Sequence, residues 1–235
     1  MSIKLEGCDL QIGYEKVISS GSFSIGDGNL IGLVGNNGVG KTTLLRTISG
    51  FIKPISGEVL VAGISLMSYK KAELSRIISV VTTTNPDVAL LSVEETVALG
   101  RFPYTNQMGI LSTEDWDMVG NSMEQCGVYS LRKKMLNQLS DGERQKVFLA
   151  KSIAQDTKIL LLDEPSSFLD FSSKNKLFYL LQKIALEENK LILISSHDIP
   201  TLLDYAHSFL LMTEGEEWKE VSESAYILNW IKSQK

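Results

Sequence analysis

Glycines, a lysine and two threonines stand together in GNNGVGKTT, Gly35 to Thr43, directly after the apolar run NLIGLV. Glycines let backbone N–H groups converge on phosphate oxygens, and a helix that starts beyond them adds the positive end of its dipole. In such a loop Lys41 reaches the β- and γ-phosphates, and the Thr42 hydroxyl ligates Mg²⁺. A chance glycine-rich turn would lack the flanking strand and helix, so the sequence predicts a site for a nucleoside triphosphate.

Two later apolar runs also end in polar residues that fit this chemistry. ILLLDE ends in Asp163, which would hold the water shell of the metal, and in Glu164, which would polarise the attacking water as a general base. LILISSHD brings His197 to the carboxyl edge of the same sheet, where it would contact the γ-phosphate. The other interpretations are a surface Asp-Glu pair that ends a strand and a structural histidine.

The stretch LSDGERQKVFLAKSIA, Leu139 to Ala154, begins with a second set of anion-binding residue types ahead of an apolar-patterned helix. Ser140 offers a hydroxyl donor, and Gly142 permits close backbone approach at a helix start. Asp141 and Glu143 add carboxylates, which would repel a phosphate, so we expect them to point outward or to bind partner groups. A capping box with no ligand is the other interpretation.

The surrounding sequence predicts the elements that position these residues. Residues 3–33 alternate as strands do, residues 92–154 have helical spacing, and the apolar runs before Asp163 and His197 read as buried strands. Apolar strands that alternate with helices imply a parallel sheet covered on both faces. We predict one α/β domain of the P-loop NTPase type over 1–235, with a mostly parallel sheet and an N-terminal antiparallel β region. Its core spans 1–83 and 156–235, and a helical subdomain is inserted at 84–155.

Composition narrows the class of protein. The net charge of −5 argues against a large nucleic-acid interface, which normally has a basic excess, so we expect no nucleic-acid partner. No apolar run approaches the ~20 residues of a membrane-spanning helix, and the N-terminus has no signal-peptide pattern, so a cytoplasmic location is expected. Cys8 and Cys126 are expected to be buried reduced thiols. Near the C-terminus, Ile227, Trp230 and Ile231 form one helical stripe that should dock on the core.

With these residues in hand, the sequence resembles the ATP-binding subunits of ABC transporters over essentially its whole length. Gly35–Thr43 is similar to the Walker A loop, Ile159–Asp163 to the Walker B strand, and Ser166–Asp170 to the D-loop. LSDGERQ resembles the family signature LSGGQ, although Asp141 replaces the usual first glycine and Glu143 the common glutamine. The resemblance implies an ABC ATPase fold with ATP and Mg²⁺ as cofactors.

The resemblance also implies a dimer and a set of site residues. In this family two subunits pack head to tail, and each signature loop closes over the ATP of its partner. Glu164 and His197 would be catalytic, and Thr42, Asp163 and Thr83 would serve the metal. The resemblance assigns nucleotide contacts to Tyr14, Gly35, Asn36, Asn37, Gly38, Val39, Gly40, Lys41, Thr42, Thr43, Ser140, Asp141, Gly142, Glu143 and Asp170.

One family residue is missing from the sequence. Relatives carry a glutamine just after the strand that here reads IISVVTTTNPD, and no glutamine occurs between Ile78 and Asn106. The position falls at Thr83, give or take one. A threonine hydroxyl is shorter, but it can act through a bridging water. We expect turnover to survive; the other outcome is an ATP-binding subunit with poor hydrolysis.

SVEETVALGRFPY, Ser92 to Tyr104, resembles the segment that lies against the membrane subunit in importers of iron-siderophore complexes, haem and cobalamin. The other interpretation is an amphipathic helix that covers the sheet, with Val93, Val97 and Leu99 as its core positions. We therefore expect a homodimeric ATPase that is peripheral on the inner face of the membrane. Its partners would be polytopic permease subunits, with only indirect contact to a substrate-binding protein. The alternative is a soluble ABC ATPase of a cofactor-assembly complex, and Glu164 and His197 disfavour a regulator without turnover.

Overall fold

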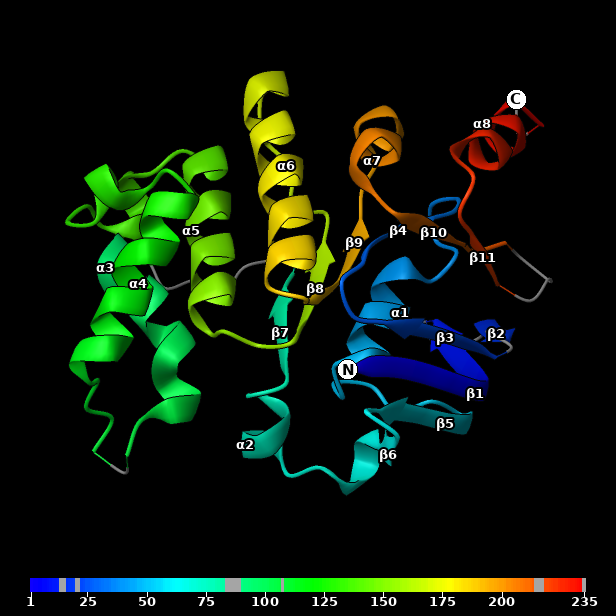
Figure 1. The fold of residues 1–235 in the computed structure, drawn as a ribbon, viewed down its shortest axis with the longest axis horizontal. Coiled ribbons are helices and arrows are strands. Elements are labelled where there is room, and N and C mark those ends of the chain that lie inside the picture. The colour runs from blue at the N-terminus through cyan, green and yellow to red at the C-terminus, as the bar shows by residue number, and fades with distance from the viewer. Residues whose placement is uncertain (13–15, 20–21, 83–89, 107, 214–217, 234–235) are drawn as a thin grey trace.

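The computed structural model describes residues 1–12, 16–19, 22–82, 90–106, 108–213 and 218–233. Two of the predicted site residues, Tyr14 and Thr83, lie outside these ranges. The elements form two sheets, with one helix between them, further helices on the opposite face of the larger sheet, and a group of helices at one end of the molecule (Figure 1).

The N-terminal residues form the predicted antiparallel region. Its central strand, β1, pairs with three others, and a register shift with a positive φ of 55° at Gly7 interrupts the ladder. Such a bulge moves the buried positions by one residue, so Ile3 and Leu5 are buried before it and Cys8 and Leu10 after it. The strands are β1 (Ser2–Ile12), β2 (Lys16–Ser19), β3 (Phe23–Gly26), β5 (Ser56–Val61) and β6 (Ile64–Ser65).

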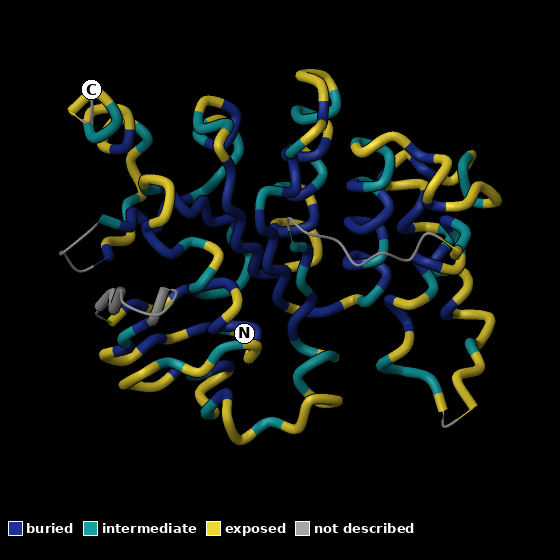
Figure 2. Tube along the Cα trace, turned by 180° about the vertical axis from the view of Figure 1, so that it is seen from behind, coloured by how far each residue is buried: buried dark blue, intermediate teal, exposed yellow. Residues whose placement is uncertain are grey.

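The main sheet has the order β11-β10-β4-β9-β8-β7 and is parallel except for β11. Every residue of β4, β8 and β9 is buried, because both faces of these strands are covered. Figure 2 shows this centre of the molecule in dark blue. The strands are β4 (Leu30–Val34), β7 (Ile78–Val81), β8 (Ile159–Asp163), β9 (Leu191–Ser195), β10 (Ser208–Leu211) and β11 (Lys219–Val221).

Successive residues of one strand belong to two different hydrophobic clusters. Leu161 of β8 packs in the cluster that contains α1 (Lys41–Ile48) and β1. Leu160 and Leu162 pack in the cluster that contains α6 (Phe171–Glu187) and α7 (Ile199–Tyr205). The alternation follows from the two-residue period of a strand. The mostly parallel α/β sheet predicted from the apolar runs is confirmed.

The described residues between β7 and β8, which are 82, 90–106 and 108–158, are mostly helical. Three α-helices among them pack against one another at one end of the molecule, where Figure 1 draws them in green. Two bonds tie the end of the third helix to the edge strand of the sheet: Ser152 Oγ donates to Ser79 Oγ (2.8 Å), and Gln155 Nε2 donates to the Ile78 carbonyl (3.2 Å). The predicted limits at 84 and 156 stay a prediction. The helices are α3 (Val93–Ala98), η2 (Leu99–Tyr104), α4 (Thr113–Gln125), η3 (Tyr129–Leu131), η4 (Leu136–Gln138) and α5 (Asp141–Ala154).

The structure tests the core positions that were expected for the helix after Ser92. Val93 and Val97 are fully buried, as a covering helix requires, but the expectation that Leu99 is a core residue is wrong, since 42% of it is exposed. It begins η2, where the change from the α to the 3₁₀ period turns its side chain off the buried face.

In the last helix, α8 (Ser224–Ser233), Ile227 is buried. Trp230 and Ile231 pack against the core, as predicted. Cys8 and Cys126 are buried thiols, also as predicted. None of the helices in the described ranges is long and apolar enough to cross a membrane. The short helices η1 (Leu66–Ser68) and α2 (Lys71–Leu74) connect the two sheets.

Candidate functional site

The glycine-rich loop runs from the end of β4 to the start of α1. Gly38 and Gly40 have positive φ values of 78° and 110°, and Gly40 is the N-cap of α1. These conformations favour glycine because a Cβ would be strained there. Gly35 has a different role: a Cβ at this residue would lie 2.4 Å from the Met212 carbonyl oxygen, so its size lets the loop pack on the residue that follows β10. Val39 is buried in the core and anchors the loop.

The side chain of Lys41 lies across this loop. Its Nζ donates to the carbonyls of Gly35 (2.7 Å) and Asn36 (3.1 Å). Burial lowers the pKa of Lys41, and the neighbouring carboxylates of Glu164 and Asp163 oppose this shift. The ammonium group is therefore held at the mouth of the loop by weak acceptors, which an anionic phosphate would outcompete.

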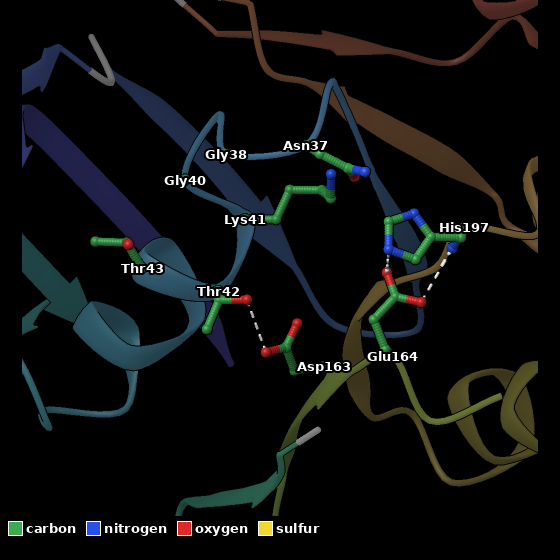
Figure 3. A pocket seen from close by; sticks show the side chains of 9 residues that line it. All are labelled: Asn37, Gly38, Gly40, Lys41, Thr42, Thr43, Asp163, Glu164 and His197. Atoms are coloured by element: carbon green, nitrogen blue, oxygen red, sulfur yellow. Dashed lines mark hydrogen bonds and ion pairs between the residues drawn. The ribbon is translucent and has the colours of Figure 1, made fainter. Parts of the chain in front are cut away.

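The residues of the loop and of the two apolar runs come together in one cavity of about 370 Å³, which we call the Lys41 cavity (Figure 3). In Figure 3 Thr42 points toward Asp163, while Thr43 points to the other side of the helix start. The geometry thus unites residues that are more than a hundred positions apart in the sequence. The cavity is lined by Asn37, Gly38, Gly40, Lys41, Thr42, Thr43, Asp163, Glu164 and His197.

Both carboxylate oxygens of Asp163 accept a hydroxyl hydrogen bond. Thr42 Oγ1 donates to Oδ2 and Ser195 Oγ donates to Oδ1, each at 2.8 Å. Ser195 is fully buried, pairs with Asp163 in the β8–β9 register, and its Oγ accepts the backbone N–H of Glu164 (2.9 Å). Ser195 was not among the site residues predicted from the sequence. The available signal was a hydroxyl residue at the end of LILIS, the strand that precedes His197.

Glu164 follows Asp163 with a φ of 53°, a conformation that is costly for a residue with a Cβ. Its carboxylate is 12% exposed; Oε2 accepts the backbone N–H of His197 (3.1 Å), and Oε1 lies 3.5 Å from His197 Nε2. Oε1 is buried and has no hydrogen-bond partner among the described residues. Burial is the largest cause of the raised pKa of this carboxyl, and the nearby His197 opposes it. Oε1 faces the ring of His197, and the carboxylate as a whole lines the Lys41 cavity, where it is placed to accept a hydrogen bond from a water molecule.

The oxygen donors at Thr42 and Asp163 fit a magnesium ion. Mg²⁺ prefers hard oxygen ligands and usually takes only one or two from the protein, with water and phosphate oxygens supplying the rest. In the part of the chain that the structure describes, no group of three or more His, Cys, Asp and Glu side chains is arranged to hold a metal. The hydroxyl and the carboxylate, already in contact at 2.8 Å, are therefore the donors available for such an ion.

The LSDGERQ stretch lines a second cavity, of about 560 Å³, which we call the Ser140 cavity. Figure 1 shows α5 well separated from α1 along the long axis of the molecule. Among the described residues, none lines both cavities. The structure therefore does not bring the predicted signature residues to the Lys41 cavity of the same chain. The Ser140 cavity is lined by Ser140, Asp141, Gly142, Glu143, Lys146, Phe168, Leu169, Asp170 and Ser173.

Gly142 contacts its own chain rather than an open surface. A Cβ at Gly142 would lie 2.9 Å from the carbonyl oxygen of Phe168, a residue that has a positive φ of 66°. Close approach is thus required here, but the approaching group is the backbone of the Ser166–Asp170 segment. Asp170 itself caps α6, accepting from Ser173 N–H at 2.8 Å.

Ser140 is the N-cap of α5 and forms a capping box with Glu143. Ser140 Oγ accepts the Glu143 N–H (3.3 Å), and Glu143 Oε2 accepts both the N–H (2.9 Å) and the O–H (2.8 Å) of Ser140. Asp141 points outward, 66% exposed, with a 3.6 Å ion pair to Arg144. The expectation that these carboxylates turn outward holds for Asp141 only, because Glu143 satisfies the start of its own helix. A phosphate contact at Ser140 stays a prediction.

Comparison with known proteins gives consistent relatives. The model of the ABC transporter family matches residues 18–167. The chain is 33% identical to a cobalamin import ATP-binding protein of Halobacterium salinarum, covering 92% of this chain and 54% of the relative. It is 33% identical to a ferric enterobactin transport ATP-binding protein of Escherichia coli, covering 91% and 79%. A dimeric structure of a bacterial ABC transporter cassette has a TM-score of 0.82 at 26% identity, covering 94% and 98%. Among the first curated relatives, the chain spans 72% of one and about half of two others (48% and 54%).

Proposed function

Because the chain belongs to the ABC transporter family and is an ABC-type ATPase domain, we propose that it powers the import of an iron chelate, haem or a cobalamin-like substrate. The observation that carries the ATPase role is the Lys41 cavity. It combines a phosphate-binding loop, a Thr42–Asp163 pair for a metal and a buried carboxylate with an unsatisfied oxygen.

The chemistry follows from the atoms that line this cavity. The Lys41 ammonium exchanges the carbonyls of Gly35 and Asn36 for β- and γ-phosphate oxygens. Thr42 and Asp163 would hold Mg²⁺, which supplies charge neutralisation at the phosphates when bound. The Glu164 carboxylate accepts a proton from the attacking water, since a carboxyl with a raised pKa is a better base. His197, 65% exposed and next to Glu164, contacts the γ-phosphate.

A head-to-tail dimer accounts for the second cavity. The Ser140 cavity offers hydroxyl and amide donors at a helix start, but it lies apart from the nucleotide loop of its own chain. In a two-fold arrangement the Ser140 cavity of each subunit would face the Lys41 cavity of the other. A bacterial ABC transporter cassette that resembles this chain forms a dimer, which supports a dimeric arrangement.

The membrane partner would dock on the helical segment between β7 and β8. Exposed apolar side chains follow one another along η2 and the chain beyond it: Leu99, Phe102, Met108, Ile110 and Trp116. Such an accumulation is characteristic of a protein interface. We propose that permease subunits cover it, so that the ATPase sits peripherally on the cytoplasmic face of the membrane and meets a substrate-binding protein only indirectly. A cofactor-assembly complex is the alternative.

The Glu164→Gln variant tests the ATPase and the dimer together. Glutamine keeps the size of the side chain but cannot accept the proton, so ATP should bind and persist while turnover falls by a factor of about 10²–10⁴. The trapped nucleotide should then hold two subunits together, which gel filtration with ATP and Mg²⁺ detects. A variant that stays monomeric at saturating ATP would contradict both assignments. Co-purification in detergent then decides the partner, since a polytopic membrane protein supports transport and a soluble complex supports assembly.

A further inference from the structure

We propose that a buried pair of hydroxyls, Ser166 and Ser196, positions His197 for its contact with the γ-phosphate. The inference deepens the proposed function and rests on the role that His197 has in it. Both serines are positioning residues, because they act through His197 and line neither the Lys41 cavity nor the Ser140 cavity.

The side chain of His197 contributes little to its own placement. It is 65% exposed, and its Nε2 lies 3.5 Å from Glu164 Oε1 (Figure 3). Within the part of the chain that the structure describes, the ring makes no shorter polar contact. The backbone therefore decides which positions the ring can reach, because a side chain swings in a few rotamers about a fixed Cα–Cβ bond. The restraints on the turn that carries His197 become restraints on its ring.

That turn lies beyond the end of the sheet. The pairing of β8 with β9 ends at Asp163 and Ser195, so the ladder does not hold the residues that follow. The pair of hydroxyls extends the connection: Ser166 Oγ and Ser196 Oγ lie 3.2 Å apart, and the two residues are 3% and 2% exposed. Ser196 Oγ also accepts the N–H of Asp198 at 3.1 Å. One hydroxyl thus holds the residues on both sides of His197.

Two other bonds restrain the same turn, and both are more easily weakened. Lys174 Nζ lies 3.2 Å from Asp198 Oδ2, but these side chains are 27% and 21% exposed, so water competes for them. Glu164 Oε2 accepts the N–H of His197 at 3.1 Å, but this carboxylate becomes a poorer acceptor when it takes a proton during hydrolysis. The bond between the serines is neutral and buried. It is therefore the restraint that stays unchanged during turnover.

The chain contains a matched control for the loss of a buried hydroxyl. Ser152 Oγ donates to Ser79 Oγ at 2.8 Å, and these residues are 3% and 1% exposed. Ser166→Ala and Ser152→Ala each remove one hydroxyl from a buried bond between two serines. Both should therefore lower the melting temperature by a similar amount. Only Ser166 is bonded to the turn that carries His197.

The experiment measures steady-state ATP hydrolysis by the two variants. We expect Ser166→Ala to lower kcat by at least about fivefold, because a misplaced contact slows the chemical step. Its KM should stay within about twofold, since no residue that lines the Lys41 cavity is altered. Ser152→Ala should stay within about twofold of the parent in both constants. Equal kcat values for the two variants would overturn the proposal. Ser166→Cys, which fills similar space with a weak hydrogen-bonding group, replaces the alanine variant if that variant does not fold.

Removal of His197 provides a readout that a structural role would not move. In a His197→Ala background the serines have no ring to position, so Ser166→Ala should change the remaining rate by less than about twofold. Release of labelled phosphate over hours measures such slow turnover. The same loss in both backgrounds would mean that Ser166 acts elsewhere, and the proposal would be wrong.

Failure of this inference is distinguishable from failure of the proposed function. If His197→Ala retains the turnover of the parent, the proposed role of His197 fails and the inference fails with it. If His197→Ala loses turnover while Ser166→Ala does not, only the inference is overturned. If Ser166→Ala loses turnover only when His197 is present, both are supported.

Discussion

The Lys41 cavity is built at the carboxyl ends of β4, β8 and β9, whereas the Ser140 cavity is built from the first turns of α5 and α6. In the first, the hydroxyls of Thr42 and Ser195 hold Asp163 from both sides, and an oxygen of Glu164 has no hydrogen-bond partner among the described residues. In the second, the capping residues satisfy one another. Residues at the carboxyl ends of strands can thus leave polar atoms available to a ligand, whereas the donors at this helix start are already paired and become available only when a stronger acceptor displaces the carboxylate.

Removing the ammonium group should have the largest effect on nucleotide binding. Lys41→Ala deletes a charge-assisted phosphate contact, so ATP affinity should fall by about 2 kcal/mol, or roughly thirtyfold. Lys146→Ala is the matched change in the Ser140 cavity and should leave the ATP affinity of the monomeric chain nearly unchanged. Fluorescent-nucleotide titration at low protein concentration measures both. Equal losses would erase the distinction between the two cavities.

Ser195→Ala tests whether the buried Ser195 hydroxyl positions Asp163 and Glu164 in the Lys41 cavity. The substitution removes the donor to Asp163 Oδ1 and the acceptor of the Glu164 N–H, so the strained backbone at Glu164 loses one of its restraints. We expect turnover to fall about tenfold, with a smaller change in KM for ATP. Ser195→Thr retains the hydroxyl and should recover part of the loss. Identical kinetics for the alanine variant and the parent would show that this hydroxyl has no positioning role.

Acid should lower the folding stability of the main sheet, which carries the Lys41 cavity, through the protonation of His207. The Leu30 N–H at the start of β4 donates to His207 Nδ1 at 2.9 Å, and burial lowers the pKa of His207. An unfolded histidine titrates near pH ~6.5, so below that pH the unfolded chain binds more protons than the folded one. This contribution to stability is complete above about pH 6.5 and is lost as the pH falls from there through the lowered pKa of the folded state. Melting temperatures should decline less steeply with acid in His207→Gln; an identical decline would exclude His207 as the cause.

The smallest effect is expected at Thr83, which lies outside the described residues. If a threonine there acts through a bridging water, Thr83→Gln should change basal ATPase by no more than about threefold. The variant should instead alter coupling to the membrane partner, which transport assays in reconstituted vesicles measure. A large rise in basal ATPase would show that the natural Lys41 cavity is a poor catalyst.

Local patterns were readable from the sequence, and contacts across the fold were not. The loop at Gly35–Thr43 was predictable because its glycines, lysine and helix start are neighbours in the chain. The capping box was also readable, since Ser140 and Glu143 are three residues apart. Ser195 was missed because its role depends on the pairing of β8 with β9, which brings it beside Asp163. The packing of Gly142 on Phe168 was not predicted either, because these residues are neighbours in the fold but not in the chain.

Because α5 is attached to β7 at its C-terminal end, a rotation about that end would move its N-terminal end. The last turns of α5 are fixed by the Ser152–Ser79 and Gln155–Ile78 bonds, whereas Ser140 stands at the opposite end. A helix of 14 residues is about 21 Å long. A tilt of about 10° around the fixed end therefore displaces Ser140 by about 4 Å, more than the length of a hydrogen bond. A small shift at the edge of the sheet would therefore become a displacement of Ser140 that is large enough to make or break a hydrogen bond.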